Sequence, residues 1–196
     1  MKSFNNIEDR LLNENKIIAG VDEVGRGSLM GPIVTCAFLI RNNEFDTEVN
    51  DSKLLSESKR NKIFVELMEN NPDFSLGLSS HLEVDEINVL NATKLAMLRA
   101  ITSLQISPDV ILIDGNQKID SQISQICIPK GDRICKSIGA ASIIAKVVRD
   151  FIVRKISTFF PYYGLAKNKG YGTEYHRKSL RQYGPSPIHR KSFKTR

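Results

Sequence analysis

The chain has 196 residues, of which 41% are hydrophobic and 26% charged, and its formal net charge is +6. This composition excludes a disordered or low-complexity chain, and its notable apolar run, the eight residues from Ile33 to Ile40, is too short to cross a bilayer. Residues 130–196 hold 16 Lys and Arg against three acids, whereas residues 1–129 hold 12 against 19, so the last third predicts either an anionic partner or a strongly solvated surface.

The first half of the chain predicts three strands and two helices. In chain order these are strands over 16–21 and 33–40, a helix over 56–69, a strand over 74–80 and a helix over 84–104. A glycine-rich turn over 23–32 joins the first two strands into a hairpin with an enlarged connection. The helix over 84–104 is indicated by apolar residues at helical spacing: Ile87, Leu90, Leu95, Leu98 and Ile101.

The second half predicts two more strands and two helices. These are strands over 110–113 and 123–128, a long helix over 136–159 and a shorter helix over 173–183, before a basic tail. The long helix should bury one apolar stripe, with Lys146 and Asp150 on the opposite side. This order predicts an α/β fold in which one mixed sheet packs on helices, as a single domain over residues 1–196.

Four acids lie at or beyond predicted strand ends. Asp22 and Glu23 follow the first strand, Asp114 ends the strand over 110–113, and Asp132 lies between a strand and the long helix. Carboxylates gathered at one sheet margin repel one another unless a cation offsets their charge, and hard divalent cations prefer oxygen ligands. The acids therefore predict a site for one or two ions such as Mg²⁺ or Mn²⁺, which can activate water against a phosphodiester.

Each of these acids also has a structural interpretation. Asp114-Gly115 is a common turn pair, and Asp132 can cap the long helix. Asp22-Glu23 is a weak signal by itself. The combination favours the metal interpretation, because acids that hold cations and a basic segment that attracts phosphates serve complementary needs.

One stretch goes beyond composition. Residues 20–34 read GVDEVGRGSLMGPIV and resemble the opening motif of bacterial ribonuclease HII. Further matches follow in the family's order: DSK at 51–53, NATKLAM at 91–97, IDG at 113–115, KGY at 169–171 and IHR at 188–190. Residues 130–150 (KGDRICKSIGAASIIAKVVRD) are similar to the family's most diagnostic segment. The resemblance covers nearly the whole chain, and the GRG loop and the short stretch before Asp22 favour ribonuclease HII over its sister family ribonuclease HIII.

The resemblance implies a ribonuclease H-like fold: a mixed five-stranded sheet flanked by helices, with a small basic helical part from about residue 165. It implies that Asp22, Glu23, Asp114 and Asp132 are catalytic and hold two Mg²⁺ or Mn²⁺ ions. The implied activity is endonucleolytic hydrolysis of RNA in RNA–DNA hybrids. It includes cutting 5′ of single ribonucleotides in duplex DNA, as in ribonucleotide excision repair, to leave a 3′-hydroxyl and a 5′-phosphate.

The resemblance also implies substrate contacts. The backbone of Gly25, Arg26 and Gly27 would contact the ribose 2′-hydroxyl, which distinguishes RNA from DNA, and Tyr171 would stack on the neighbouring deoxyribose. Basic side chains are looser candidates for phosphate contacts: Lys53, Lys146, Lys167, Lys169, Arg177 and Arg181. A tight turn, a half-buried core tyrosine and solvated surface charges remain the structural alternatives.

Other expectations concern the setting of the protein. A binding module that only holds duplex nucleic acid would explain the basic segment but not the acids, and a nuclease acting on DNA alone would leave the glycine loop without a role.

Met30 stands where the family commonly has alanine, and it should fit an apolar pocket. Three cysteines without metal-type spacing indicate reduced thiols in a cytoplasmic protein, away from membranes and monomeric by default.

Overall fold

The computed structural model describes residues 7–41, 55–70 and 72–194. Its sheet has five strands: β1 (Ile18–Val24), β2 (Ile33–Ile40), β3 (Phe74–Ser79), β4 (Val110–Asp114) and β5 (Ser124–Ile128). The strand order is β3-β2-β1-β4-β5, in which β3, β2 and β1 are antiparallel neighbours while β4 and β5 run parallel to β1. The predicted mixed five-stranded sheet is confirmed.

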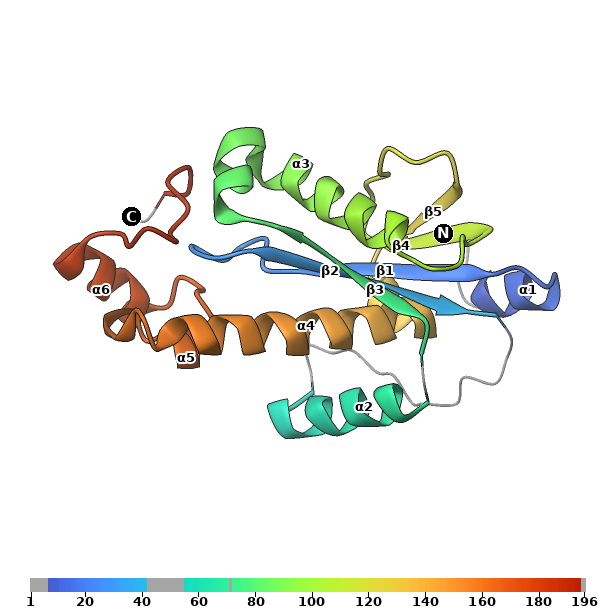
Figure 1. Cartoon of the computed structure of the whole chain (residues 1–196), viewed down its shortest axis with the longest axis horizontal. Coiled ribbons are helices and arrows are strands. Elements are labelled where there is room, and N and C mark those ends of the chain that lie inside the picture. Colours follow the sequence, from blue (N-terminus) through green and yellow to red (C-terminus); the bar gives the residue numbers. More distant parts are fainter. Residues whose placement is uncertain (1–6, 42–54, 71, 195–196) are drawn as a thin grey trace.

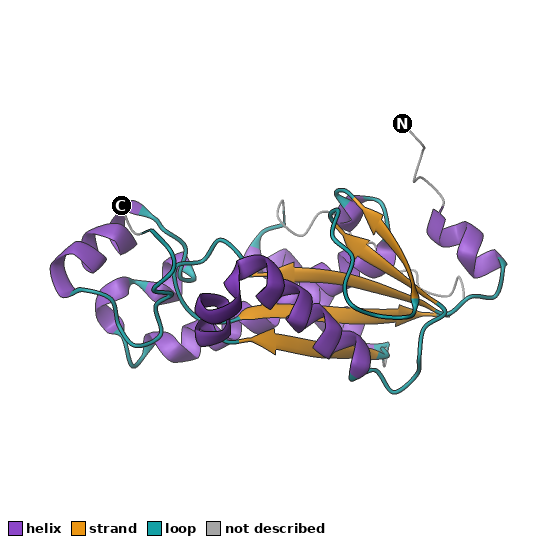
Figure 2. Cartoon of the chain, turned by 90° about the horizontal axis from the view of Figure 1, so that it is seen from above, coloured by secondary structure: helices purple, strands orange, loops and turns teal. Residues whose placement is uncertain are grey.

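Helices cover both faces of this sheet (Figure 1). α3 (His81–Thr102) lies on one face and α4 (Lys136–Ser157) on the other, with α2 (Glu57–Glu69) packed outside α4. The shorter elements are α1 (Ile7–Asn13), the 3₁₀ turns η1 (Gly131–Arg133) and η2 (Pro161–Tyr163), α5 (Leu165–Asn168) and α6 (Glu174–Tyr183). Figure 2 shows that α1 lies at one end of the molecule and the C-terminal elements at the other.

The predicted helix is confirmed as α3, which packs closely on the sheet through small residues. Ala92, Ala96 and Ala100 are fully buried, whereas four of the five apolar residues that indicated the helix are only partly buried. The reason is a close approach between helix and strand: a Cβ on Gly77 of β3 would collide with the carbonyl oxygen of Ala96. Large side chains do not fit between backbones at that separation.

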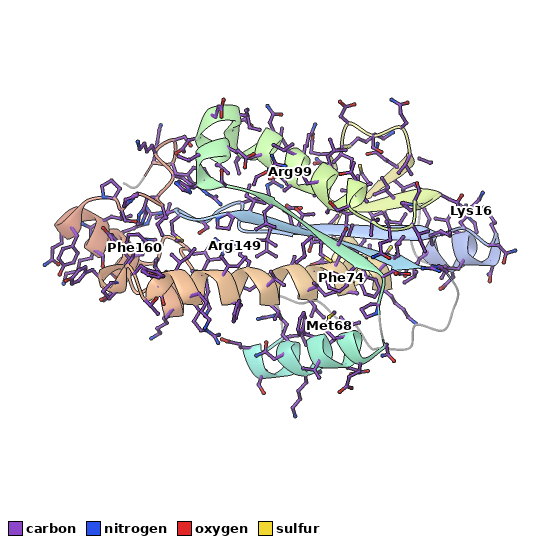
Figure 3. All side chains as sticks on the ribbon, in the orientation of Figure 1. Lys16, Met68, Phe74, Arg99, Arg149 and Phe160 are labelled. Atoms are coloured by element: carbon purple, nitrogen blue, oxygen red, sulfur yellow. The ribbon has the colours of Figure 1, made fainter. Side chains whose placement is uncertain are left out.

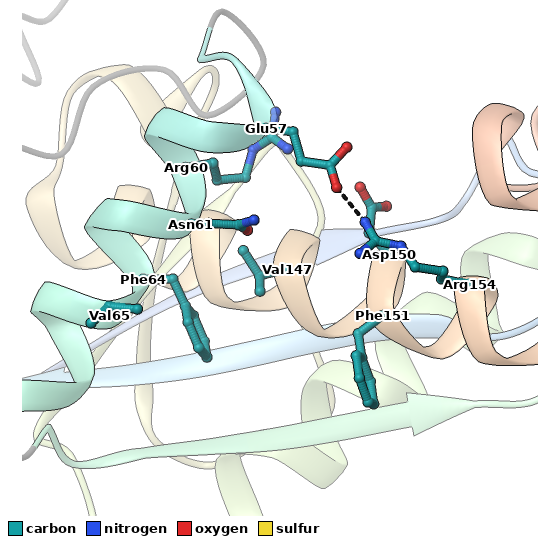
Figure 4. A pocket seen from close by; sticks show the side chains of 9 residues that line it. All are labelled: Glu57, Arg60, Asn61, Phe64, Val65, Val147, Asp150, Phe151 and Arg154. Carbon is teal, nitrogen blue, oxygen red and sulfur yellow. Dashed lines mark hydrogen bonds and ion pairs between the residues drawn. The ribbon is translucent and has the colours of Figure 1, made fainter.

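α4 is buried on all sides over its first half, so a single predicted stripe was too narrow. Every residue from 137 to 145 is buried, and a Cβ on Gly20 of β1 would collide with the backbone at Ser137. Asp150 lines a cavity against α2 rather than facing open solvent, and Lys146 Nζ lies 2.7 Å from Asp150 Oδ1. Figure 4 shows Asp150 in a cavity of about 250 Å³ between α2 and α4, which contains none of the four predicted acids.

The N-terminus of α4 is capped by a residue from α1, a helix that the sequence did not predict. The carboxylate of Glu8 accepts hydrogen bonds from the backbone N–H groups of Lys136 (2.7 Å) and Ser137 (3.0 Å). A carboxylate at a helix N-terminus satisfies donors that have no partner within the helix. Asp132 is therefore not the cap of α4; Cys135 occupies the cap position, without a side-chain hydrogen bond.

The helices and the cysteines of the structure bear on the predictions about membranes and thiols. Among the described residues, no helix is both long and apolar enough to cross a membrane. Cys36, Cys127 and Cys135 are free thiols, as predicted, and the first and last of these are buried.

Candidate active site

The parallel pairing of β1 with β4 brings acids from two strands to one edge of the sheet. Val21 of β1 lies opposite Ile113 of β4, so the next residues, Asp22 and Asp114, come side by side where the pairing of these two strands ends. β1 itself continues to Val24, so Asp22 and Glu23 lie inside the strand and not, as the sequence predicted, after it. Asp114 Oδ1 accepts a hydrogen bond from the N–H of Gly131 (2.7 Å), which places the buried Asp132 one residue beyond that contact. The strand ends thus gather Asp22, Glu23 and Asp114, with Asp132 in the adjoining turn.

Negative charge is poorly compensated at this edge. Burial raises the pKa of Asp22 well above its usual range, and repulsion from Glu23 and Asp114 raises it further, against hydrogen bonds from Ser142 and the Glu23 N–H. Burial also raises the pKa of Glu23, although Arg26 lies 3.2 Å away and favours its charged form. Both carboxylates would therefore gain from a nearby cation.

The donor chemistry of this edge fits a hard divalent cation. The acids offer carboxylate oxygens, the ligands that Mg²⁺ and Mn²⁺ prefer. Within the part of the chain that the structure describes, however, no three His, Cys, Asp or Glu side chains are gathered tightly enough to form a ready-made metal site. Mutual repulsion opposes such gathering in the absence of a cation, and Asp22 and Glu23 are successive residues of one strand, which start toward opposite faces.

The glycine loop over 25–32 rests on a buried arginine that sequence reasoning missed. Gly25 has a φ of 105°, and a Cβ there would collide with the guanidinium of Arg149 from α4. That guanidinium is fully buried and donates to the carbonyl oxygens of Pro32 (3.0 Å), Met30 (3.3 Å) and Lys169 (3.0 Å). Figure 3 shows Arg149 on the side of α4 that faces the sheet.

A second buried arginine holds the same loop from the C-terminal segment. Arg190 is 1% exposed and donates to the carbonyl oxygens of Gly31 (2.9 Å) and Arg26 (2.8 Å). Burial and repulsion from Arg149 lower the pKa of Arg190 to about 10, so it stays charged at neutral pH. Neither arginine forms a salt bridge with any described residue. The only available signal was their position inside the motifs at 130–150 and 188–190.

Gly27, the second glycine of the GRG loop, is not explained by contacts inside the protein. A Cβ on Gly27 would meet nothing within 4 Å, so this glycine is not required by the protein's own packing. Its bare backbone leaves room for a molecule outside the chain. Arg26 between the two glycines is partly exposed and ion-paired with Glu23.

Tyr171 lies beside the glycine loop. An isolated β-bridge pairs it with Ser28, and its half-buried ring centre lies 5.5 Å from Arg149 Cζ and 5.9 Å from Lys146 Nζ. The N–H of Leu29 also donates to the carbonyl oxygen of Gly170 (2.9 Å). The predicted loop and the predicted tyrosine are therefore neighbours in space, although more than 140 residues separate them in sequence.

The lysines and arginines that were predicted to contact phosphate differ in their surroundings. Lys146 is ion-paired with Asp150, Lys169 Nζ donates to the carbonyl oxygen of Ala166 (2.6 Å), and Arg177 donates to that of Gly172 (3.0 Å). Lys167 and Arg181 are exposed, and Lys53 lies outside the described residues. Met30 is fully buried among apolar residues of the C-terminal elements, so the predicted apolar pocket is confirmed.

Comparison with known proteins covers the whole of this region. The family model described as "Ribonuclease HII" matches residues 19–196. The chain is 48% identical over 177 residues to ribonuclease HII of Ligilactobacillus salivarius, covering 90% of this chain and 69% of the relative. It is 42% identical over 193 residues to ribonuclease HII of Caldicellulosiruptor saccharolyticus, covering 98% and 94%. A crystal structure of ribonuclease H2 from Pyrococcus horikoshii superposes with a TM-score of 0.75 at 30% identity, covering 91% and 94%.

Proposed function

The chain belongs to the ribonuclease HII family, and from that premise we propose how it recognises and cuts its substrate. It is a ribonuclease H, an endonuclease that degrades the RNA of RNA–DNA hybrids. We propose that it also cuts on the 5′ side of a single ribonucleotide in duplex DNA, leaving a 3′-hydroxyl and a 5′-phosphate. The observation that carries this proposal is the bridge between Ser28 and Tyr171, which places the tyrosine next to the glycine loop.

We assign metal binding to the four acids. The family depends on divalent metal ions, and Asp22, Glu23, Asp114 and Asp132 are the residues that would hold Mg²⁺ or Mn²⁺ here. Two such ions, when bound, supply Lewis acidity that lowers the pKa of an attacking water and stabilises the departing 3′-oxygen. The four acids would supply the carboxylate ligands and substrate phosphates would supply others, so we expect weak metal affinity without nucleic acid.

We assign ribose recognition to residues 25–27. Arg149 and Arg190 hold the carbonyl side of the loop against the protein, which fixes the backbone that a 2′-hydroxyl would meet. Gly27 lets a sugar edge approach because no side chain intervenes. The two buried positive charges also attract the phosphates on either side of that sugar. Tyr171 provides an aromatic surface for the next deoxyribose, and Lys146 and Lys169 add to the attraction for phosphate from partly buried positions.

The test uses a labelled DNA duplex that contains one ribonucleotide. With Mg²⁺ or Mn²⁺ we expect a single cut 5′ of the ribonucleotide, and none after EDTA is added. An RNA–DNA hybrid should be cut at many positions, and an all-DNA duplex should stay intact. Cutting of the all-DNA duplex would favour a DNA nuclease, and binding without any cutting would favour a mere binding module; either result contradicts the proposal.

Two conservative variants test whether cutting requires the acids at this sheet edge or is equally sensitive to the loss of any aspartate. Asp22→Asn should abolish cutting while duplex binding in EDTA is retained. Asp120→Asn, which neutralises an exposed aspartate in the β4–β5 loop, should cut like the unmodified protein. Metal-dependent cutting by the Asp22→Asn variant would remove Asp22 from the metal site.

A further inference from the structure

The backbone of the loop that presents Tyr171 is held from three directions. The carbonyl oxygen of Lys169 accepts from Arg149 of α4 (3.0 Å), that of Gly170 from Leu29 of the glycine loop (2.9 Å), and that of Tyr171 from the His176 ring of α6 (3.0 Å). Lys169 and Gly170 both have positive φ values, so this is a specific and strained turn. The third contact leads to a pair of histidines that the proposed reaction does not use.

His176 and His189 form a buried imidazole pair. Their Nε2 atoms lie 2.9 Å apart, and the two side chains are 0% and 3% exposed. The backbone N–H of Ser186 donates to His189 Nδ1 (3.0 Å), so that nitrogen must be an acceptor. A neutral His189 ring then carries its proton on Nε2 and donates to His176 Nε2. His176 in turn carries its proton on Nδ1 and donates to the carbonyl oxygen of Tyr171.

The surroundings keep both rings neutral at physiological pH. Burial lowers the pKa of His176, and Arg177 lowers it further; burial, His176 and His81 lower the pKa of His189 to about 4. The ring of Tyr163 packs 4.8 Å from His189 and 6.1 Å from His176, centre to centre. The backbone N–H of Ser186 thus sets the direction of a relay, a chain of hydrogen bonds that runs from Ser186 through both histidines to the carbonyl oxygen of Tyr171.

The hydrogen-bonded chain through the two histidines also connects back to the glycine loop. His189 is bridged to Met30 of the glycine loop, and the carbonyl oxygen of Ile188 accepts from the N–H of Gly31 (3.0 Å). Ser28 of the same loop is bridged to Tyr171. A contact path therefore runs from the glycine loop to Tyr171, through both imidazoles and back to the glycine loop.

We propose that His176 and His189 are positioning residues for Tyr171: through the directed relay they fix the tyrosine backbone relative to the glycine loop, and so place its ring against the sugar next to the ribonucleotide. This inference rests on the proposed role of Tyr171 in substrate recognition. Neither histidine touches the reacting atoms. Their effect on cutting should therefore require the tyrosine ring.

The test is a double-mutant cycle between His176→Phe and Tyr171→Ala on the single-ribonucleotide duplex. When Tyr171 is intact, we expect His176→Phe to lower kcat/KM by about 10-fold, since small displacements of positioned groups have effects of that order. In the Tyr171→Ala background the same change should lower it by less than about 2-fold, because the positioned ring is already gone. Equal effects in the two backgrounds would overturn the inference, as would no effect of His176→Phe in either.

Two further variants separate positioning from loss of packing. His176→Asn keeps a donor for the Tyr171 carbonyl and should recover most of the activity that His176→Phe loses. Leu180→Ala removes a buried side chain of the same helix that takes no part in the relay, so its effect should be equal in both tyrosine backgrounds. If His176→Phe fails to fold, the same cycle with His176→Gln decides the question, because Gln keeps a polar group facing His189 but has no donor at the Nδ1 position.

Failure of the proposed function would be recognised separately. If the unmodified protein cuts no ribonucleotide-containing duplex, the cycle is measured instead as dissociation constants for that duplex in EDTA, with the same expected non-additivity. The imidazole ¹⁵N signals at neutral pH provide a measurement that needs no substrate. We expect a protonated Nδ1 on His176 and a protonated Nε2 on His189, and the reverse tautomers or a charged ring would overturn the relay.

Discussion

Neutralising Asp22 should make the metal-free protein more stable while destroying its activity. Asp22 is 3% exposed, and burial together with repulsion from Glu23 and Asp114 raises its pKa well above the usual range. Asp22→Asn keeps the size of the side chain and an oxygen that can accept the Glu23 N–H, but it removes the charge. Relief of such a strained active-site group typically stabilises by about 1–2 kcal/mol, which is about 2–8 °C in Tm for a chain of this length.

The assay is thermal unfolding in EDTA and in Mg²⁺, at several pH values. A carboxyl whose pKa is raised in the folded state stabilises fully below its unfolded pKa, and this contribution is lost as the pH rises. In EDTA the unmodified protein should therefore lose stability above about pH 4 more steeply than the variant does. Mg²⁺ at a concentration well above its dissociation constant should raise the Tm of the unmodified protein, through binding to the folded state, and leave the variant almost unchanged. Cutting by the variant should fall by at least about 10²–10³-fold.

A control of opposite sign comes from Glu83. Hydrogen bonds from Arg99 and from the Ser80 backbone lower the pKa of Glu83 to about 2, so its charge is compensated in the folded state. Glu83→Gln should therefore reduce stability at neutral pH. An Asp22→Asn variant that is no more stable than the unmodified protein in EDTA would refute the reasoning, because Asp22 would then be a satisfied structural group.

Three smaller predictions follow from packing and titration. Gly77→Ala should destabilise by about 3 kcal/mol or more in denaturant unfolding, because its Cβ meets the α3 backbone, whereas Gly27→Ala should change stability by less than about 1 kcal/mol; similar values for the two would contradict the close approach. Thr35→Val should stabilise by about 1 kcal/mol, since the buried Thr35 hydroxyl has no hydrogen-bond partner among the described residues, and a clear loss of stability would reveal one. The pKa of His189 is lowered to about 4 from 6.5, so the unfolded chain takes up the proton first as the pH falls. The contribution of His189 to stability should be constant above pH 6.5 and fall by at most about 3 kcal/mol toward pH 4, and an equal fall in His189→Gln would exclude this group as the cause.

The strands could be predicted because their signals are local. Apolar runs and alternation over five to eight residues placed all five, and a strand that ends in an acid also places that acid at a sheet edge. The pairing of Asp22 with Asp114 additionally needs β1 and β4 to be parallel neighbours, which strand signals alone do not determine. The family resemblance, not the pattern of residues, indicated that arrangement.

Helix orientation and the buried polar groups depend on contacts that no local pattern contains. The face of α3 that packs on the sheet approaches Gly77 on a different element, so the spacing of large apolar residues predicted the helix but not this face. α1 is only seven residues long, and its Glu8 finds its partners in α4, more than 120 residues away. His176 and His189 are likewise paired only after α6 and the C-terminal segment fold together.

Two of the positive charges near this site, those of Arg149 and Arg190, are held by backbone contacts rather than by the acids. Arg149 and Arg190 are buried and positive near a loop that follows buried and negative carboxylates, yet they do not form salt bridges with any described acid. Each guanidinium is engaged by fixed carbonyl oxygens of the glycine loop, and its planar donor array has no freedom to turn toward the acids. In the proposed site, the two arginine charges would therefore add to the attraction for phosphate while their donors stay bound to backbone carbonyl oxygens.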